Sequence, residues 1–347
     1  MTKNRITIKD IARELKISTS TVSRALADKW DVNPETRRAV MELSEKLNYR
    51  PNQISLNLKK QQSMTIGIVI PEFINSFFPE VIIGIESVLR PIGYQILICQ
   101  SNESPDTELA NIRMLENKMV DGFLISMSAE TCNPSYFNTL AENDSPVVFF
   151  NRICPGINAS SVVIDDYKWA FRATEHLIEQ GARRIVHMAG PENLEVAIRR
   201  KQGYLDALEK QGLPQDDELV IPCGVMMERG VMGAYKILEM EHRPDGIFAF
   251  NDPVAIGAMK TLQKRGSLRI PDDIAVVGFT ESKMAVIIEP NLTSIEQPTF
   301  EMGKAAAELL MEQLKNKSDE KRACKTIILD AKLNVRESSC KNAPTEE

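Results

Sequence analysis

From Thr65 onward the chain repeats one pattern, in which a short and almost unbroken apolar run is followed by a stretch with helical periodicity. The runs form two series, first Ile66–Ile70, Ile96–Cys99, Phe123–Ile125 and Val147–Phe150, then Ile185–Met188, Ile247–Phe250 and Ile274–Val277. Strands without alternating polar residues, separated by helices, are typical of parallel sheets covered on both faces. The pattern therefore predicts two doubly wound α/β lobes.

Two breaks in this pattern, near Ser160–Tyr167 and at Pro290–Pro298, predict where the chain passes between the lobes. A helix over Phe300–Lys315 and strands over Lys325–Leu329 and Lys332–Val335 are expected to complete the lobes. The body is expected to span residues 61–340, with 64–165 and 296–320 in the first lobe and 166–295 and 321–340 in the second.

The first 60 residues have a different organisation, which predicts three short helices. Thr7, with Asp10 three residues later, is expected to cap the first helix. Ser18 is expected to cap a second helix over Thr19–Ala27, and Asn33-Pro34 to begin a third. Two helices joined by a three-residue break fit a helix-turn-helix, whose second helix lies in the major groove of DNA.

The second helix begins with hydroxyl side chains, which suit phosphate oxygens or base edges, and Arg24 can fork onto a guanine. The hydroxyl residues are Thr19, Ser20, Thr21 and Ser23. The same residues also fit a capping cluster followed by a solvated arginine. Charge favours DNA, because residues 1–60 carry 13 Lys/Arg against 7 Asp/Glu, whereas the remainder carries 29 against 41. A basic head on an acidic body predicts that only the head binds a polyanion.

The composition argues against several other classes of protein. The 347 residues, 43% hydrophobic and 26% charged, are typical of a globular chain, and no apolar run approaches the length needed to span a bilayer. The six cysteines and three histidines show no metal-ligand spacing, so we expect no zinc site, disulfide framework or cofactor. The charged N-terminus does not lead into an apolar signal core, which predicts a cytoplasmic protein without membrane contact.

Several motifs resemble the lactose/galactose repressor (LacI/GalR) family. They are Ile8-Lys9-Asp10-Ile11-Ala12, Ile17-Ser18-Thr19-Ser20-Thr21-Val22-Ser23-Arg24-Ala25-Leu26, Val32-Asn33-Pro34-Glu35-Thr36-Arg37 and Leu333-Asn334-Val335-Arg336-Glu337. The likeness covers essentially the whole chain. It implies a helix-turn-helix head and a body that resembles the fold of periplasmic binding proteins. It also implies a homodimer that binds double-stranded operator DNA under the control of a small-molecule effector.

The resemblance extends the expected DNA contacts beyond the second helix. A hinge segment over about 52–60 would pair with its copy, with Leu58 as a wedge in the minor groove and Lys59 on phosphate. The alternative is that Leu58 merely begins the packing of the body. The head is therefore expected to span 1–60, and its expected DNA-binding residues are Thr7, Ser18, Thr19, Ser20, Thr21, Ser23, Arg24, Asn33, Thr36, Tyr49, Asn52, Leu58 and Lys59.

Ligands of open parallel sheets bind beyond the carboxyl ends of the strands, where this chain carries polar residues such as Glu72, Asn151-Arg152, Asn251 and Thr280. The resemblance adds Arg200, in an Arg-x-x-Gly-Tyr motif, as a residue that reaches the effector. The acidic pair Asp165-Asp166 is interpreted as helix capping rather than chemistry. The expected effector-binding residues are Phe77, Phe78, Asn151, Arg152, Arg200, Asn251, Thr280 and Gln297.

One departure from the family affects the expected ligand. Many relatives carry Gly-Phe-Asp-Asp where this chain has Gly278-Phe279-Thr280-Glu281, so the aspartate that commonly anchors a sugar or purine is absent. Asn151 is neutral as well. A sugar or sugar derivative is the expected effector, and an anionic or phosphorylated ligand held by Arg200 is the alternative.

These motifs leave three functions to compare. The first is a transcriptional regulator, expected to be a repressor, whose operator affinity depends on the effector. The second is a solute-binding protein without DNA function, but the chain lacks the signal peptide of an exported protein. The third is an enzyme, which lacks support because no Gly-x-Gly-x-x-Gly, Walker, Gly-x-Ser-x-Gly or His-Glu-x-x-His motif occurs. The sequence favours the regulator.

Overall fold

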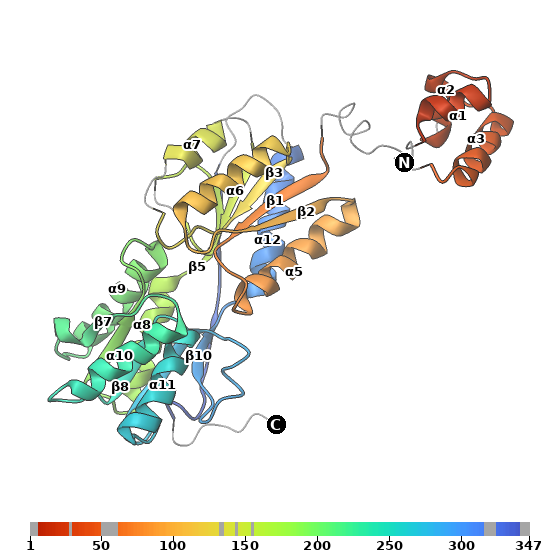
Figure 1. Cartoon of the computed structure of the whole chain (residues 1–347). Coiled ribbons are helices and arrows are strands. Elements are labelled where there is room, and N and C mark those ends of the chain that lie inside the picture. Colours follow the sequence, from red (N-terminus) through yellow and green to blue (C-terminus); the bar gives the residue numbers. More distant parts are fainter. Residues whose placement is uncertain are drawn as a thin grey trace. The chain divides into compact units, whose positions relative to one another are not determined.

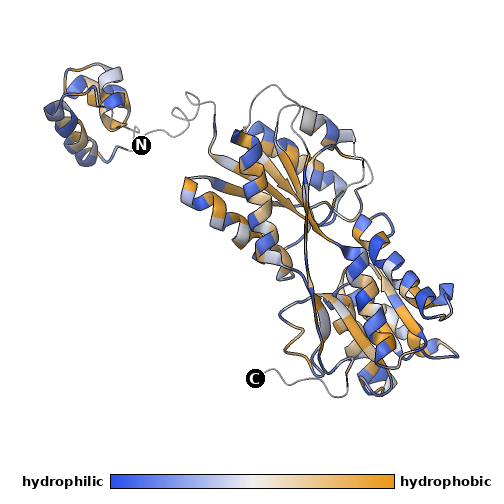
Figure 2. Cartoon of the chain, turned by 180° about the vertical axis from the view of Figure 1, so that it is seen from behind, coloured by the Kyte–Doolittle hydropathy of each residue, from blue (hydrophilic) through white to orange (hydrophobic). Residues whose placement is uncertain are grey.

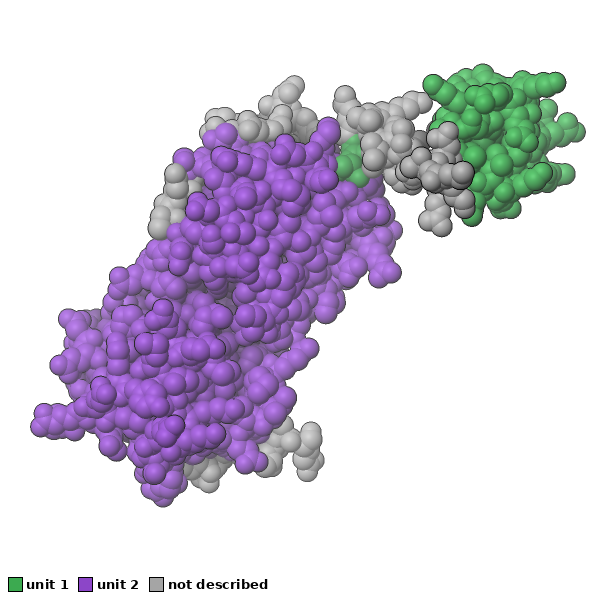
Figure 3. All heavy atoms as spheres, viewed as in Figure 1, with its two compact units in different colours: residues 1–63 green, residues 64–347 purple. Residues whose placement is uncertain are grey.

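The computed structural model describes residues 6–27, 30–49, 62–131, 135–142, 145–153, 156–315 and 324–340. The chain divides into two compact units, Met1–Ser63 and Met64–Glu347 (Figure 3). Asn52, Leu58 and Lys59 lie outside the described residues, so their DNA contacts stay predictions. Among the helices that are described, none is long and apolar enough to cross a membrane.

The first unit contains the three predicted helices, α1 (Ile8–Glu14), α2 (Thr19–Leu26) and α3 (Pro34–Lys46). Their apolar faces meet in a small core that includes the fully buried Ile11, Val22 and Val40. Thr7, Ser18 and Asn33 occupy the positions just before the three helices, as their capping patterns predict.

The first lobe of the body is a six-stranded parallel sheet in the order β11-β5-β4-β3-β1-β2. Its central strands are apolar and buried on both faces, because helices cover both sides (Figures 1 and 2). The strands are β1 (Thr65–Ile70), β2 (Gln95–Gln100), β3 (Gly122–Ile125), β4 (Val147–Phe150), β5 (Ser160–Ile164) and β11 (Thr326–Leu329). The helices are α5 (Phe77–Leu89), η1 (Arg90–Ile92), α6 (Pro105–Asn117), α7 (Ser135–Glu142) and α12 (Thr299–Lys315).

Helices α5 and α12 pack closely although more than two hundred residues separate them in the chain. Gly84 and Gly303 make this contact possible. A Cβ on Gly84 would lie 2.1 Å from the Phe300 carbonyl oxygen, and one on Gly303 would lie 1.9 Å from that of Val81. The pair of glycines therefore fixes the C-terminal helix to the first lobe.

The second lobe repeats the architecture with the sheet order β12-β10-β9-β8-β6-β7, in which only β12 runs antiparallel among the described strands. The strands are β6 (Ile185–Ala189), β7 (Val220–Pro222), β8 (Gly246–Ala249), β9 (Ala275–Thr280), β10 (Thr293–Glu296) and β12 (Lys332–Asn334). The helices are α8 (Asp166–Glu179), α9 (Glu195–Lys210), η2 (Asp217–Leu219), α10 (Met227–Glu239) and α11 (Asp252–Gly266). The predicted fold class is confirmed.

The chain passes between the lobes after β5, after β10 and between β11 and β12. The expected assignment of residues 321–340 to the second lobe is wrong for β11, whereas β12 does belong to the second sheet. Strand β11 instead pairs with β5 in the first sheet, with Thr326 opposite Ser161. The reason is the preceding helix, α12, which packs on β3, β4 and β5 and returns the chain to that edge. The residue pattern of a short edge strand does not show which sheet it joins.

Candidate functional site

The start of α2 carries the hydroxyl cluster that the sequence singled out. The Ser18 hydroxyl oxygen accepts a hydrogen bond from the Thr21 backbone N–H at 3.0 Å, and it also bonds the hydroxyls of Ser20 and Thr21. Ser18 is therefore a helix cap, while Thr19 and Ser20 remain exposed. Capping and DNA contact are compatible here, because the cap fixes the direction in which these side chains leave the helix.

The other helix caps of the head also bond residues that lie two or three positions away in the sequence. The Asp10 carboxylate accepts hydrogen bonds from the Thr7 N–H and hydroxyl, which lowers the pKa of Asp10. The Asn33 side chain accepts from the Glu35 N–H at 2.8 Å. Tyr49 is half-buried against the head's core, and Thr36 is half-buried on α3. Whether these residues contact DNA stays a prediction.

Arg24 lies on the exposed side of α2 and forms an ion pair with Asp31. Its Nη1 lies 3.0 Å from Asp31 Oδ2, and the two side chains are 50% and 36% exposed. An exposed ion pair is weak and screened by salt. A phosphate or a guanine can therefore compete for Arg24.

The second candidate site is a cleft between the two lobes of the body, with a volume of about 630 Å³ that includes its open mouth. All eight residues expected to bind the effector line it, namely Phe77, Phe78, Asn151, Arg152, Arg200, Asn251, Thr280 and Gln297. The first four belong to the first lobe, and Gln297 lies where the chain crosses back from the second. Their contact with a ligand stays a prediction.

Arg200 projects from α9 and is almost fully buried. Its Nε donates to Asp166 Oδ1 at 2.8 Å and its Nη1 donates to the Phe250 carbonyl oxygen at 2.6 Å. The guanidinium also lies over the Phe279 ring, 3.6 Å from the ring centre. Burial raises the pKa of the Asp166 carboxyl, and the Arg200 charge acts in the opposite direction. The positive charge of Arg200, which is expected to hold an anionic ligand in the alternative, is therefore already paired with the Asp166 carboxylate.

The acidic pair before α8 divides into two roles. Asp165 caps the helix, since its carboxylate accepts from the Lys168 N–H at 2.9 Å. Asp166 instead holds Arg200, so the interpretation of both residues as caps is wrong for Asp166. The contact joins residues 34 positions apart on two helices that pack together, which a local pattern does not reveal.

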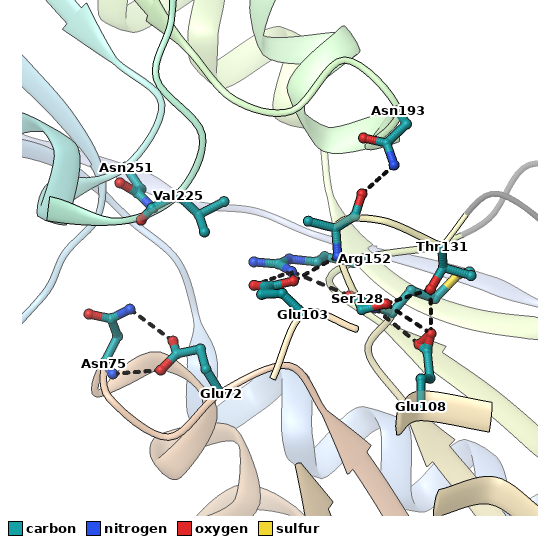
Figure 4. A network of polar contacts seen from close by, with 12 residues as sticks. Glu72, Asn75, Glu103, Glu108, Ser128, Thr131, Arg152, Asn193, Val225 and Asn251 are labelled. Atoms are coloured by element: carbon teal, nitrogen blue, oxygen red, sulfur yellow. Dashed lines mark hydrogen bonds and ion pairs between the residues drawn. The ribbon is translucent and has the colours of Figure 1, made fainter. Parts of the chain in front are cut away.

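Arg152 is the second arginine of the cleft and is held from the first lobe (Figure 4). Its Nη1 donates to both carboxylate oxygens of Glu103, at 2.9 and 2.8 Å. Glu103 also accepts a hydrogen bond from the Ala129 N–H at 2.7 Å. The carbonyl oxygen of Ala129 in turn accepts from Asn193, a residue of the second lobe. One chain of polar contacts therefore runs from the cleft to a bond between the lobes.

The residues that follow the strands of the second lobe are held by local hydrogen bonds and, at Thr280, in an unusual backbone conformation. Asn251 caps α11, accepting from the Val254 N–H at 3.0 Å, and donates to the Val225 carbonyl oxygen. Next to it the buried Asp252 accepts from the Ser294 hydroxyl, and burial raises the pKa of Asp252 to about 6. Thr280 has a backbone φ of +131°, a strained conformation for a β-branched residue.

Several lining residues are not among the expected site residues, including Glu72, Asn75 and Glu103. The sequence pattern marks Glu72 as a strand-end residue without a role, and it does not mark Asn75 or Glu103. Glu103 lies three residues beyond β2, so the rule that sites lie past the carboxyl ends of strands would have found it. Glu72 accepts hydrogen bonds from both the backbone and side-chain nitrogens of Asn75, at 3.0 and 2.8 Å (Figure 4).

A helix-turn-helix head and a two-lobed body with an interlobe cleft define a DNA-binding regulator of the ligand-responsive class. Residues 63–333 match the family of periplasmic binding proteins and the sugar binding domain of the LacI family, and residues 7–52 match the bacterial regulatory proteins of the lacI family. The chain belongs to the LacI family and is a transcriptional regulator.

Curated relatives are similar over most of their length. The HTH-type transcriptional repressor PurR of Vibrio atlanticus is 34% identical over 318 residues, which cover 91% of this chain and 94% of that protein. Catabolite control protein A of Priestia megaterium is 33% identical and covers 88% of this chain and 91% of its own.

Solved structures also match. A complex of the transcriptional regulator CelR with cellobiose is 30% identical, with a TM-score of 0.73 over 96% of this chain and all of that one. The lac repressor dimer bound to operator shares the fold, with a TM-score of 0.85 at 21% identity over 97% of this chain and 99% of that one.

Proposed function

We propose that this chain is a homodimeric repressor that binds an operator through the start of α2 and responds to an uncharged sugar bound in the cleft. The observation that carries the proposal is the shared location of the eight expected effector residues, which both lobes bring to one cleft. The site of action is the cytoplasm, where bacterial operators lie. The proposal contains no catalytic step and no cofactor.

The chemistry of the cleft wall supports a hydroxyl-rich ligand. Gln297 is only 5% exposed, and its Oε1 has no hydrogen-bond partner among the described residues. Glu72 and Thr280 add acceptor oxygens, and Phe77 and Phe78 add apolar surface. Sugar hydroxyls can donate to the acceptors while the C–H face of the ring packs against the aromatic side chains.

Exposed apolar residues of the first lobe support the dimer. Ile83 on α5 is 58% exposed, and Leu97 and Ile98 on the edge strand β2 are each 39% exposed. A strand at the edge of a sheet with apolar neighbours is suited to burial against a second copy. The lac repressor of the same fold is a dimer on its operator.

The test measures ligand and operator binding with the full chain. Cellobiose and ribose are the first probes, because similar regulators have been solved with them. We expect one sugar to raise the melting temperature and to change the affinity for a fragment of the chain's own promoter by about 5- to 150-fold.

Two variants test whether the sugar response depends on the cleft. Gln297→Ala removes a cleft acceptor and is expected to abolish the sugar response, while Gln202→Ala, an exposed glutamine of α9, leaves it intact. Equal affinity of the full chain for promoter and random duplex, with and without a broader sugar panel, contradicts the proposal.

A further inference from the structure

The two arginines among the residues that line the cleft are both neutralised from within the protein. Arg200 pairs with Asp166, and Arg152 pairs with Glu103. We propose that Glu103 sets the charge specificity of the cleft, because its pairing with Arg152 excludes anionic effectors in favour of uncharged ones. The inference rests on the proposed function only in taking the cleft as the effector site.

The contacts of Glu103 make it difficult to displace. Both carboxylate oxygens accept from Arg152 Nη1, and one of them also accepts from the Ala129 N–H. The Arg152 and Glu103 side chains are only 9% and 21% exposed, so solvent screens the pair weakly. An anion that binds Arg152 has to lie beside the Glu103 carboxylate, and two like charges repel strongly in so buried a place.

Glu72, the other carboxylate among the described lining residues, also disfavours an anionic ligand. Glu72 is buried, and its described hydrogen bonds come from Asn75, a neutral residue. An anionic ligand would therefore meet two carboxylates and two arginines that are already paired. The wall instead offers acceptor oxygens, including Gln297 Oε1, to the donating hydroxyls of a neutral ligand.

The backbone at Glu103 is held in an unusual conformation. Asn102 and Glu103 have φ values of +54° and +60°, and neither is glycine. Left-handed residues that are not glycine persist where surrounding contacts enforce them, and they cluster at ligand sites. In this conformation the Glu103 carboxylate faces Arg152 (Figure 4). It also accepts from the Ala129 N–H.

The test is a gain of anion binding in the full-length protein. Glu103→Gln removes the charge but keeps an oxygen that can accept from the Ala129 N–H. The matched control is Asp106→Asn, which removes one carboxylate from an exposed position on the following helix, α6, outside the cleft lining. The probe is inorganic phosphate, with titration calorimetry as the readout, and any phosphate bound by the basic head is common to both variants.

We expect E103Q to bind phosphate about tenfold or more tightly than either the wild type or D106N, because the uncompensated Arg152 charge becomes available. The double variant E103Q/R152Q, in which both charges are removed, is expected to lose that gain. If E103Q lacks a cooperative melting transition, Glu103→Ser is measured instead and carries the same expectation.

Equal phosphate affinity in E103Q and D106N overturns the inference, as does a gain that persists in E103Q/R152Q. Failure of the proposed function has a different signature, namely wild-type protein whose operator affinity no sugar changes. The phosphate comparison needs neither the operator nor the natural effector, so the two failures are distinguishable.

Discussion

The head and the body of this protein use arginine in opposite ways. Arg24 and its partner Asp31 are 50% and 36% exposed, whereas Arg200 and Asp166 are 3% and 8% exposed. Water and salt weaken the exposed pair, so a polyanion can replace Asp31 at little cost. The buried pair is protected from screening, and removing one partner leaves a charge without compensation. The exposed Arg24 can therefore exchange its partner, while the two buried arginines of the cleft are held in place.

Salt provides the largest contrast between the two regions. If the head contacts about 6–10 phosphates, operator affinity is expected to fall about 10³- to 10⁵-fold between 50 and 200 mM salt. Binding of an uncharged sugar in the cleft is expected to change little over the same range. Measuring both affinities at several salt concentrations checks this, and similar slopes for the two ligands would contradict the comparison.

The next largest effect is expected for Arg200→Ala, which leaves Asp166 buried without its partner. We expect a loss of about 3–5 kcal/mol in the free energy of unfolding, together with loss of the effector response. The matched control is Arg199→Ala, since this neighbouring side chain is exposed and its ion pair among the described residues is with Glu195 of the same helix. Chemical denaturation of both variants is the measurement, and equal losses would show that burial does not distinguish the two arginines.

Acid is expected to destabilise the body through its buried histidines. Burial lowers the pKa of His187 from 6.5 to about 4, and the ring stacks against Tyr204 and Phe248. The unfolded chain therefore takes up a proton that the folded chain excludes as the pH falls from about 6.5 to 4, and stability decreases by about 3 kcal/mol. Burial of His176 acts in the same direction, whereas the raised pKa of Asp252 opposes it.

The variant His187→Phe keeps the stacking and is expected to reduce the acid sensitivity, measured as unfolding free energy against pH. His242→Phe replaces an exposed histidine and serves as the control. An unchanged pH profile in His187→Phe would exclude His187 as the source.

The smallest effect is expected in the head. Arg24→Ala should weaken operator binding by about 1–3 kcal/mol if the guanidinium reads a guanine, with the loss confined to sequences that carry that base. Asp31→Asn removes the competing carboxylate and is expected to strengthen binding slightly, at most by the worth of an exposed ion pair. Affinities for the operator and for single-base variants distinguish base reading from phosphate contact, since a phosphate contact weakens all sequences equally.

Much of the head could be predicted from the sequence because its contacts are local. The caps at Ser18 and Asn33 bond residues three and two positions ahead, so residue type and spacing are sufficient. The eight cleft residues could be proposed because parallel strands end at a common edge and because the family motifs are present. Their partners could not be predicted. Glu103 and Arg152 are 49 positions apart, and Asn193 and Ala129 are 64 apart.

The sequence by itself determined where the helices of the head begin, that the central strands of the body are buried on both faces, and that positive charge is concentrated at one end of the chain. Short-range hydrogen bonds decide the first feature, runs of apolar residues decide the second, and the positions of the charged side chains decide the third. Only the tertiary structure decided which carboxylate neutralises each cleft arginine and which sheet β11 joins. The physical reason is that a buried charge is paired by whatever group the folded chain brings within about 3 Å, and distance along the chain does not limit that choice.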